Sequence, residues 1–102
     1  MKPYAKLLPA FLLVLLFTSM VPKPKKILFF GDSITEMGVQ AGGYVSIIKK
    51  TLDSTKYSLV GAGIGGNKVY DLYLRLEDDV LSKNPDVVVI YVGVNDVWHK
   101  QS

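Results

Sequence analysis

The sequence contains no cysteine, so disulfide bonds, thiolate metal sites and a lipidated N-terminal cysteine are excluded. It contains a single histidine, His99, and it shows no internal repeat or low-complexity segment. With 102 residues the chain is at most one domain, and its hydrophobic fraction of 49% is ample for a globular core.

Positive charge is concentrated at the N-terminus. The whole chain has a formal net charge of +3, but five of its twelve basic residues lie within the first 26 positions. From Ile27 onward seven basic residues stand against nine acidic ones, a net charge of −2. The part expected to fold is therefore mildly acidic, and nothing in its charge supports nucleic-acid binding.

The first 21 residues are typical of a targeting segment. Lys2 and Lys6 precede an almost uniformly apolar run, residues 7–21, which is shorter than the roughly 20 residues of a full membrane span. We expect an exported protein in which residues 1–21 are either a signal peptide or an N-terminal membrane anchor. No well-placed pair of small residues marks a cleavage site. Residues 22–26 read as an extended linker.

Strand and helix patterns alternate after the linker. Three apolar runs have the length of buried strands: residues 25–30, 57–60 and 87–92. Apolar residues recur at helical spacing in the two segments between them: residues 44–52 and 67–83. This order predicts a parallel sheet with right-handed crossovers. The third run is continuously apolar and mostly β-branched, which predicts a strand covered on both faces.

A polar or glycine-rich segment follows each predicted strand. These segments are Gly31-Asp32-Ser33-Ile34-Thr35, the run 61–66 with Asn67, and Gly93-Val94-Asn95-Asp96. Ligands bind at the carboxyl edge of open α/β sheets. The sequence therefore predicts one site to which all three segments contribute.

The three segments resemble the blocks of the SGNH hydrolases, also called the GDSL esterase and lipase family. Gly31-Asp32-Ser33 matches the first block, Gly66-Asn67 the second, and Gly93-Val94-Asn95-Asp96 the third. The similarity covers residues 27–99 and is closest to bacterial exported lipase-like acylhydrolases. It implies a three-layer, flavodoxin-like α/β fold, of which residues 27–102 supply the N-terminal part, with the first three strands and two main helices.

The resemblance also implies a chemistry. It is hydrolysis of carboxylic or acyl esters through an acyl-enzyme, with Ser33 as nucleophile and with no cofactor or metal. The implied oxyanion donors are the backbone N–H groups of Ser33 and Gly66 and the side-chain amide of Asn95. Three further residues are expected to support the site: Asp32, Asn67 and Asp96. The partner is a small-molecule, lipid or glycan ester, and any membrane contact runs through residues 7–21.

The family's fourth block, an Asp-x-x-His with the catalytic acid and base, has no separate counterpart. The residues Asp96-Val97-Trp98-His99 match this motif, but Asp96 already belongs to the third block. We therefore expect His99 to be a loop residue or a substrate contact rather than the base. The chain is expected to be the N-terminal portion of such an enzyme, as a fragment or as a truncated form with impaired activity.

Other interpretations of the same residues remain open. Ser33 and Glu36 fit a helix capping box, and Asn67 fits a helix N-cap. One alternative function is an inactive, membrane-tethered remnant that binds acylated or glycan ligands. Another is a dinucleotide-binding module, because Gly61, Gly63 and Gly66 spell Gly-x-Gly-x-x-Gly between a predicted strand and helix. The acidic residue that this fingerprint needs at the end of the next strand has no match at the right spacing.

Overall fold

A computed structural model describes residues 22–99, so the predicted targeting segment lies outside the described residues. Three strands form a parallel sheet in the order β2-β1-β3. Their bounds are Lys25–Gly31 for β1, Tyr57–Gly63 for β2 and Val87–Tyr91 for β3. The predicted parallel sheet is confirmed.

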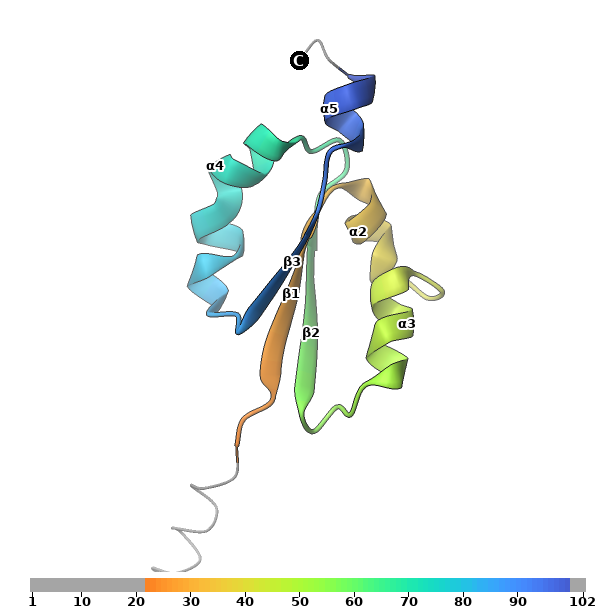
Figure 1. The fold of residues 1–102 in the computed structure, drawn as a ribbon, viewed down its shortest axis with the longest axis vertical. Coiled ribbons are helices and arrows are strands. Elements are labelled where there is room, and N and C mark those ends of the chain that lie inside the picture. The colour runs from red at the N-terminus through yellow and green to blue at the C-terminus, as the bar shows by residue number, and fades with distance from the viewer. Residues whose placement is uncertain (1–21, 100–102) are drawn as a thin grey trace, which may run out of the picture.

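Helices cover both faces of this sheet, which gives three layers (Figure 1). Helices α2 (Ser33–Gly38) and α3 (Tyr44–Thr51) lie on one face, and α4 (Val69–Asp79) lies on the other. A short 3-10 turn, η2 (Leu81–Lys83), leads from α4 to β3, and α5 (Val94–Trp98) follows β3. None of the helices between residues 22 and 99 is long and apolar enough to cross a membrane.

Several predicted boundaries differ from the structure: β1 begins at Lys25, inside the predicted linker 22–26, and α4 ends at Asp79 rather than at residue 83. Strand β2 continues through Gly61–Gly63, because this run pairs in register with Phe29–Gly31 of β1. Helix α4 begins one residue after its N-cap position at Lys68, so Asn67 is not the N-cap. The N–H of Lys68 instead donates to the Asp71 carboxylate at 2.8 Å.

The core alternates between the two faces of β1, as a strand with a side-chain period of two requires. Leu28 and Phe30 are buried with Leu72 and Val80 on the α4 side. On the other side the Phe29 ring meets the ring of Tyr44 edge-on, at 5.9 Å between centroids. Full burial of such a side chain contributes about 1.5–3 kcal/mol to the free energy of folding.

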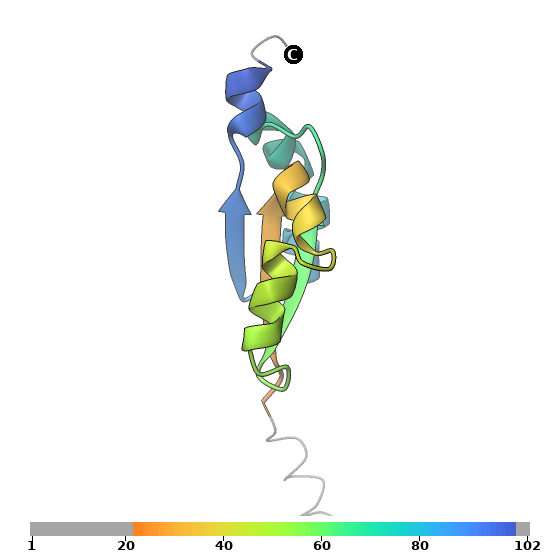
Figure 2. The same ribbon diagram turned by 90° about the vertical axis from the view of Figure 1, so that its right-hand side faces the viewer.

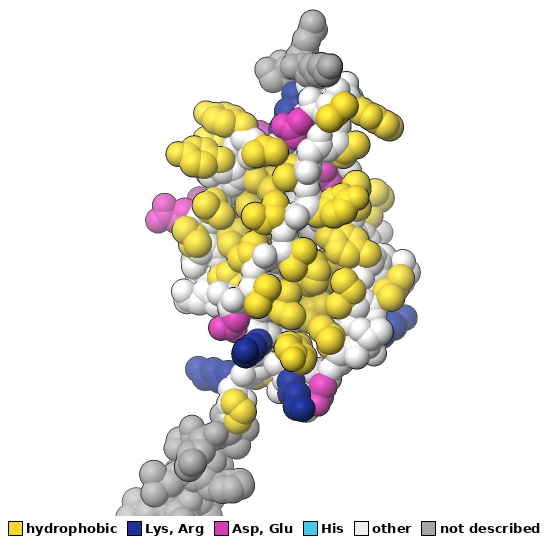
Figure 3. All heavy atoms as spheres, viewed as in Figure 1, with side chains coloured by type: hydrophobic (Ala, Val, Ile, Leu, Met, Phe, Trp, Pro, Cys, Tyr) yellow, Lys and Arg dark blue, Asp and Glu magenta, His cyan; other side chains and the backbone are white. Residues whose placement is uncertain are grey.

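Strand β3 lies at the edge of the sheet (Figure 2), and all five of its residues are exposed. The exposed fractions run from 37% for Val88 to 62% for Ile90. Within residues 22–99, β3 pairs only with β1. Hydrophobic side chains cover most of the face that includes β3 (Figure 3). The prediction that this strand is covered on both faces is therefore wrong for the described part of the chain.

Candidate active site

The three predicted segments meet at the carboxyl edge of the sheet (Figure 1). Gly31, the last residue of β1, pairs with Gly63 of β2 on one side and with Tyr91 of β3 on the other. Because the strands are parallel, the residues that follow them are delivered to one edge. The structure thus brings together segments that lie up to 65 residues apart in the sequence.

Ser33 is the first residue of α2 and is half-buried. Asp32 caps this helix, because its Oδ1 accepts a hydrogen bond from the N–H of Ile34 at 3.0 Å. Asp32 is fully buried, and its Oδ2 has no partner among residues 22–99. The N–H groups of a first helical turn have no acceptor within the helix, so the backbone N–H of Ser33 can be donated to a ligand.

Glu36 joins the first segment to the second. Its Oε2 accepts a hydrogen bond from the N–H of Gly65 at 2.6 Å, instead of closing the capping box that its spacing to Ser33 suggested. A Cβ placed on Gly65 would lie 3.8 Å from the Cβ of Ser33. The loop after β2 therefore lies directly against the serine.

Gly66 is exposed and has a positive φ of 79°, a conformation that side chains of L-residues rarely adopt. Apart from Gly66 itself and its two neighbours in the chain, no described residue has an atom within 4 Å of the position that its Cβ would occupy. The turn around it is closed by a hydrogen bond from the N–H of Asn67 to the carbonyl of Ile64, at 3.3 Å. This glycine is required by the backbone and leaves open space beside the loop.

Asn95 joins the third segment to the second. Its Nδ2 donates to the main-chain carbonyl of Asn67 at 3.0 Å. An amide nitrogen carries two hydrogens, so one donor remains after this contact. Asp96 belongs to α5, and its carboxylate packs against the start of α4. The carboxylate oxygens lie 3.3 and 3.4 Å from the N–H nitrogen of Val69.

His99 follows α5 and is exposed. Its main-chain N–H donates to the carbonyl of Asn95 at 2.9 Å, and its own carbonyl accepts from the ammonium group of Lys68. The Asp96 carboxylate is directed to Val69 rather than to the imidazole. The structure therefore does not join Asp96 and His99 as an acid and base pair.

The glycines of the dinucleotide motif have packing roles. Gly61 and Gly63 belong to β2, and a Cβ on Gly63 would lie 2.2 Å from the backbone nitrogen of Glu36. At the start of α4, where a phosphate would sit, stands the carboxylate of Asp96. This arrangement disfavours a bound dinucleotide. No group of three or more candidate metal ligands occurs in the part of the chain that the structure describes.

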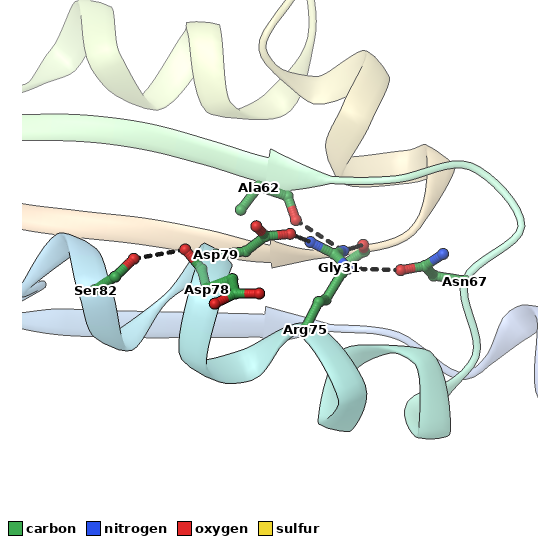
Figure 4. Close-up of polar contacts among 7 residues, drawn as sticks. All are labelled: Gly31, Ala62, Asn67, Arg75, Asp78, Asp79 and Ser82. Carbon is green, nitrogen blue, oxygen red and sulfur yellow. Dashed lines mark hydrogen bonds and ion pairs between the residues drawn. The ribbon is translucent and has the colours of Figure 1, made fainter.

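Arg75, the only arginine in the chain, lies at the centre of a group of polar contacts (Figure 4). The sequence motifs did not predict its role. Arg75 extends from α4 to the ends of β1 and β2, where its Nη2 donates to the carbonyls of Gly31 and Ala62 at 2.8 and 3.0 Å. Its Nε donates to Oδ1 of Asn67 at 2.7 Å, which explains why Asn67 does not cap α4. The one sequence signal was a lone arginine among eleven lysines, on the apolar side of an amphipathic helix.

Comparison with known proteins gives a consistent family. The model of the GDSL-like Lipase/Acylhydrolase family matches residues 29–102. An acetylxylan esterase of Geobacillus stearothermophilus is 38% identical over 91 residues, which cover 74% of this chain and 42% of that protein.

Solved structures agree with this match. The crystal structure of the acetyl xylan esterase AlAXEase has a TM-score of 0.69 and 66% sequence identity, and the match covers 74% of this chain and 40% of that one. The structure of Axe2, an acetylxylan esterase from Geobacillus stearothermophilus, has a TM-score of 0.64 and 35% identity over 80% of this chain and 44% of that one. The chain thus spans less than half the length of these relatives.

Proposed function

The chain belongs to the GDSL-like lipase/acylhydrolase family, and from this premise we propose that it acts as a serine ester hydrolase with Ser33 as nucleophile. In the proposed reaction Ser33 Oγ attacks the carbonyl carbon of the ester and loses its proton to a base. The base passes this proton to the leaving alcohol, and water then cleaves the acyl-serine, which releases the acid and restores the Ser33 hydroxyl. We do not assign the base to His99, because the Asp96 carboxylate is directed to Val69 and not to the imidazole.

One observation carries this proposal. Glu36 holds the N–H of Gly65 at 2.6 Å, so the loop that contains Gly66 is fixed against Ser33. We infer that an ester carbonyl at Ser33 receives hydrogen bonds from the N–H groups of Ser33 and Gly66. The amide of Asn95, anchored on Asn67, supplies the third donor. Such donors stabilise the negative charge that develops on the oxygen in the transition state.

We further propose that the substrate is an acetyl ester carried by a sugar. The support is that two related proteins are named acetylxylan esterases. Gly66 is exposed and no atom fills the space beside it, which suits an ester on a large, solvated glycan. A polysaccharide is met outside the cell, which agrees with export directed by residues 7–21, whether that segment is cleaved or retained as an anchor.

The nucleophile is tested by replacing it in the full chain. Ser33→Ala should lower hydrolysis of 4-nitrophenyl acetate to the uncatalysed background, a loss of about 1,000-fold or more in kcat. The matched control is Ser58→Ala, which removes an exposed hydroxyl from β2 and should leave the rate unchanged. Hydrolysis that persists in Ser33→Ala would refute the assignment.

The substrate class needs its own measurement. Acetate released from acetylated xylo-oligosaccharides is compared with hydrolysis of 4-nitrophenyl acetate and 4-nitrophenyl palmitate. We expect kcat/KM for both acetyl esters to exceed that for the palmitoyl ester, and the release of acetate to depend on Ser33. A preference for palmitate would point to an acyl-lipid substrate instead.

A further inference from the structure

A single side chain bonds to two of the three segments that carry the proposed oxyanion donors, and it is linked to the third through Asn67. Arg75 bonds to Gly31, Ala62 and Asn67 at the carboxyl edge of the sheet (Figure 4). We propose that Arg75 is a positioning residue that sets the spacing of these donors. This inference rests on the proposed ester hydrolysis, because without that reaction there is no oxyanion to stabilise.

Arg75 is linked to the serine through the carbonyl of Gly31. The carbonyl of Gly31 belongs to the peptide group that precedes Asp32, so its orientation governs how the chain enters α2 at Ser33. This carbonyl accepts two hydrogen bonds, one from Arg75 at 2.8 Å and one from the N–H of Ile64 at 3.1 Å. The contact with Arg75 therefore fixes the chain two residues before the nucleophile.

Arg75 also holds the loop after β2 at both of its ends. The same Nη2 that binds Gly31 also donates to the carbonyl of Ala62 at 3.0 Å, so one nitrogen sets the distance between the ends of two neighbouring strands. On the far side of the loop, Nε holds the side chain of Asn67 at 2.7 Å. Gly66 lies between these two anchor points, and its backbone is thereby held at both ends.

Asn95 is linked to Arg75 through Asn67. Its Nδ2 donates to the main-chain carbonyl of Asn67, while Arg75 holds the side chain of that same residue. Fixing Asn67 therefore also fixes the acceptor on which the Asn95 amide rests. Arg75 contacts none of the three donors directly: it reaches Gly66 and Asn95 through Asn67, and Ser33 through Gly31 and Asp32.

The arginine is itself held in place. Its side chain is 14% exposed, and its Nη1 pairs with Asp79 at 3.0 Å, one helical turn further along α4. The guanidinium carbon lies 4.6 Å from the centroid of the Phe30 ring, a favourable cation–π distance. A planar guanidinium offers several N–H donors in fixed directions, whereas the ammonium of lysine has one nitrogen. A lysine at this position therefore cannot donate hydrogen bonds to Asn67, Gly31 and Ala62 at the same time.

The direct test uses NMR on the full chain. Because Arg75 is the only arginine, labelling with 15N-arginine gives one Nε–H signal without further assignment. We expect this proton to exchange with water more slowly than that of free arginine. Exchange at the rate of free arginine would overturn the proposal even without a variant.

Two variants then separate positioning from general stability. In Arg75→Lys and Arg75→Met we expect the signals of the Gly66 N–H and the Asn95 Nδ2 to shift, with helix content by circular dichroism retained. Lys56→Met removes a cation elsewhere on the fold and should leave both signals in place. A folded Arg75→Lys protein with unshifted Gly66 and Asn95 signals would refute a positioning role.

Kinetics complete the test. A displacement of about 1 Å in a catalytic group costs on the order of 100-fold in rate. We expect both Arg75 variants to lower kcat by about this factor with KM within about twofold, and lysine not to rescue the arginine. If the unaltered chain shows no Ser33-dependent hydrolysis, the proposed function fails, while the exchange rate and the NMR shifts still decide whether Arg75 holds the three segments.

Discussion

The side-chain amide of Asn95 donates a hydrogen bond to the main-chain carbonyl of Asn67 at 3.0 Å, across 28 residues of sequence. This contact ties the segment after β3 to the segment after β2. It orients the amide by occupying one of its two hydrogens, and the second hydrogen remains available. The segments after β2 and β3 are thereby held next to each other at the carboxyl edge of the sheet.

Asn95→Asp should remove this link and the proposed third donor together. A carboxylate only accepts hydrogen bonds, so it cannot donate to the Asn67 carbonyl or to a substrate oxygen. We expect kcat for 4-nitrophenyl acetate to fall by about 100- to 1,000-fold. Gln40→Glu, a similar change at an exposed position, is the control for added charge and should leave kcat unchanged. An Asn95→Asp protein with normal kcat would exclude Asn95 from the site.

Gly66→Ala should cost stability and activity, whereas Gly42→Ala should cost stability alone. Both glycines have φ near +80° and open space where a Cβ would stand, so each substitution carries only the backbone penalty of about 1–2 kcal/mol. Urea unfolding should show similar losses for the two variants. Hydrolysis should fall only in Gly66→Ala, and an equal fall in both would attribute the loss to stability.

Glu36→Leu should loosen the loop beside Ser33, because it removes the acceptor of the Gly65 N–H. A hydrogen bond to a carboxylate contributes about 1.5–3 kcal/mol, so we expect a loss of roughly 10- to 100-fold in kcat. Glu36→Gln keeps an oxygen acceptor at the same position and should lose less than about threefold. If the two variants lose kcat equally, the charge of Glu36 matters rather than its contact with Gly65.

The sequence correctly predicted the strands and helices that are marked by apolar runs or by apolar residues at helical spacing. The three apolar runs became β1, β2 and β3, and the two helical patterns became α3 and α4. Gly61–Gly63 looked like a loop because glycine weakens a strand, but pairing with β1 makes it strand. Helix α2 was anticipated only in the alternative interpretation of Ser33 and Glu36 as a capping box, and in the structure Asp32 is the cap.

The candidate site was predicted from its motifs only in part. Ser33, Gly66 and Asn95 follow three strands, and parallel topology alone is enough to bring them to one edge. The motifs could not reveal Arg75, because it belongs to none of the three segments and its spacing to Asp79 is that of an ordinary ion pair on a helix. Its three partners outside α4 are determined by how α4 packs on the sheet, which the local sequence does not show.

Asp53 should respond to acid through its contact with Thr55. The hydroxyl of Thr55 donates to the Asp53 carboxylate at 2.6 Å, and this bond, followed by the backbone N–H of Thr55, lowers the pKa of Asp53 below its ordinary value of 3.8. Since the pKa is lower in the folded state, the stabilisation is present above the ordinary pKa and is lost as the pH falls through the folded value. Thr55→Val should raise the pKa of Asp53 in a carboxyl NMR titration. Thr51→Val, whose hydroxyl bonds to Ile48, should not change it.

Ile90→Lys should suppress self-association of the chain. Residues 87–91 contain no charge and no proline, all five are exposed, and within residues 22–99 the outer edge of β3 is unpaired. Such an edge is a template for pairing with another chain, and a lysine on it opposes that pairing.

The control is Leu81→Lys, which replaces a comparably exposed apolar residue, 56% against 62%, outside the strand. Sedimentation velocity over a range of concentrations should show association of the unaltered chain and of Leu81→Lys, and less association of Ile90→Lys. Because both substitutions are at exposed positions, unfolding free energies should change by no more than about 0.5 kcal/mol. Equal relief of association by the two variants would mean that general surface hydrophobicity, rather than the edge of β3, causes it.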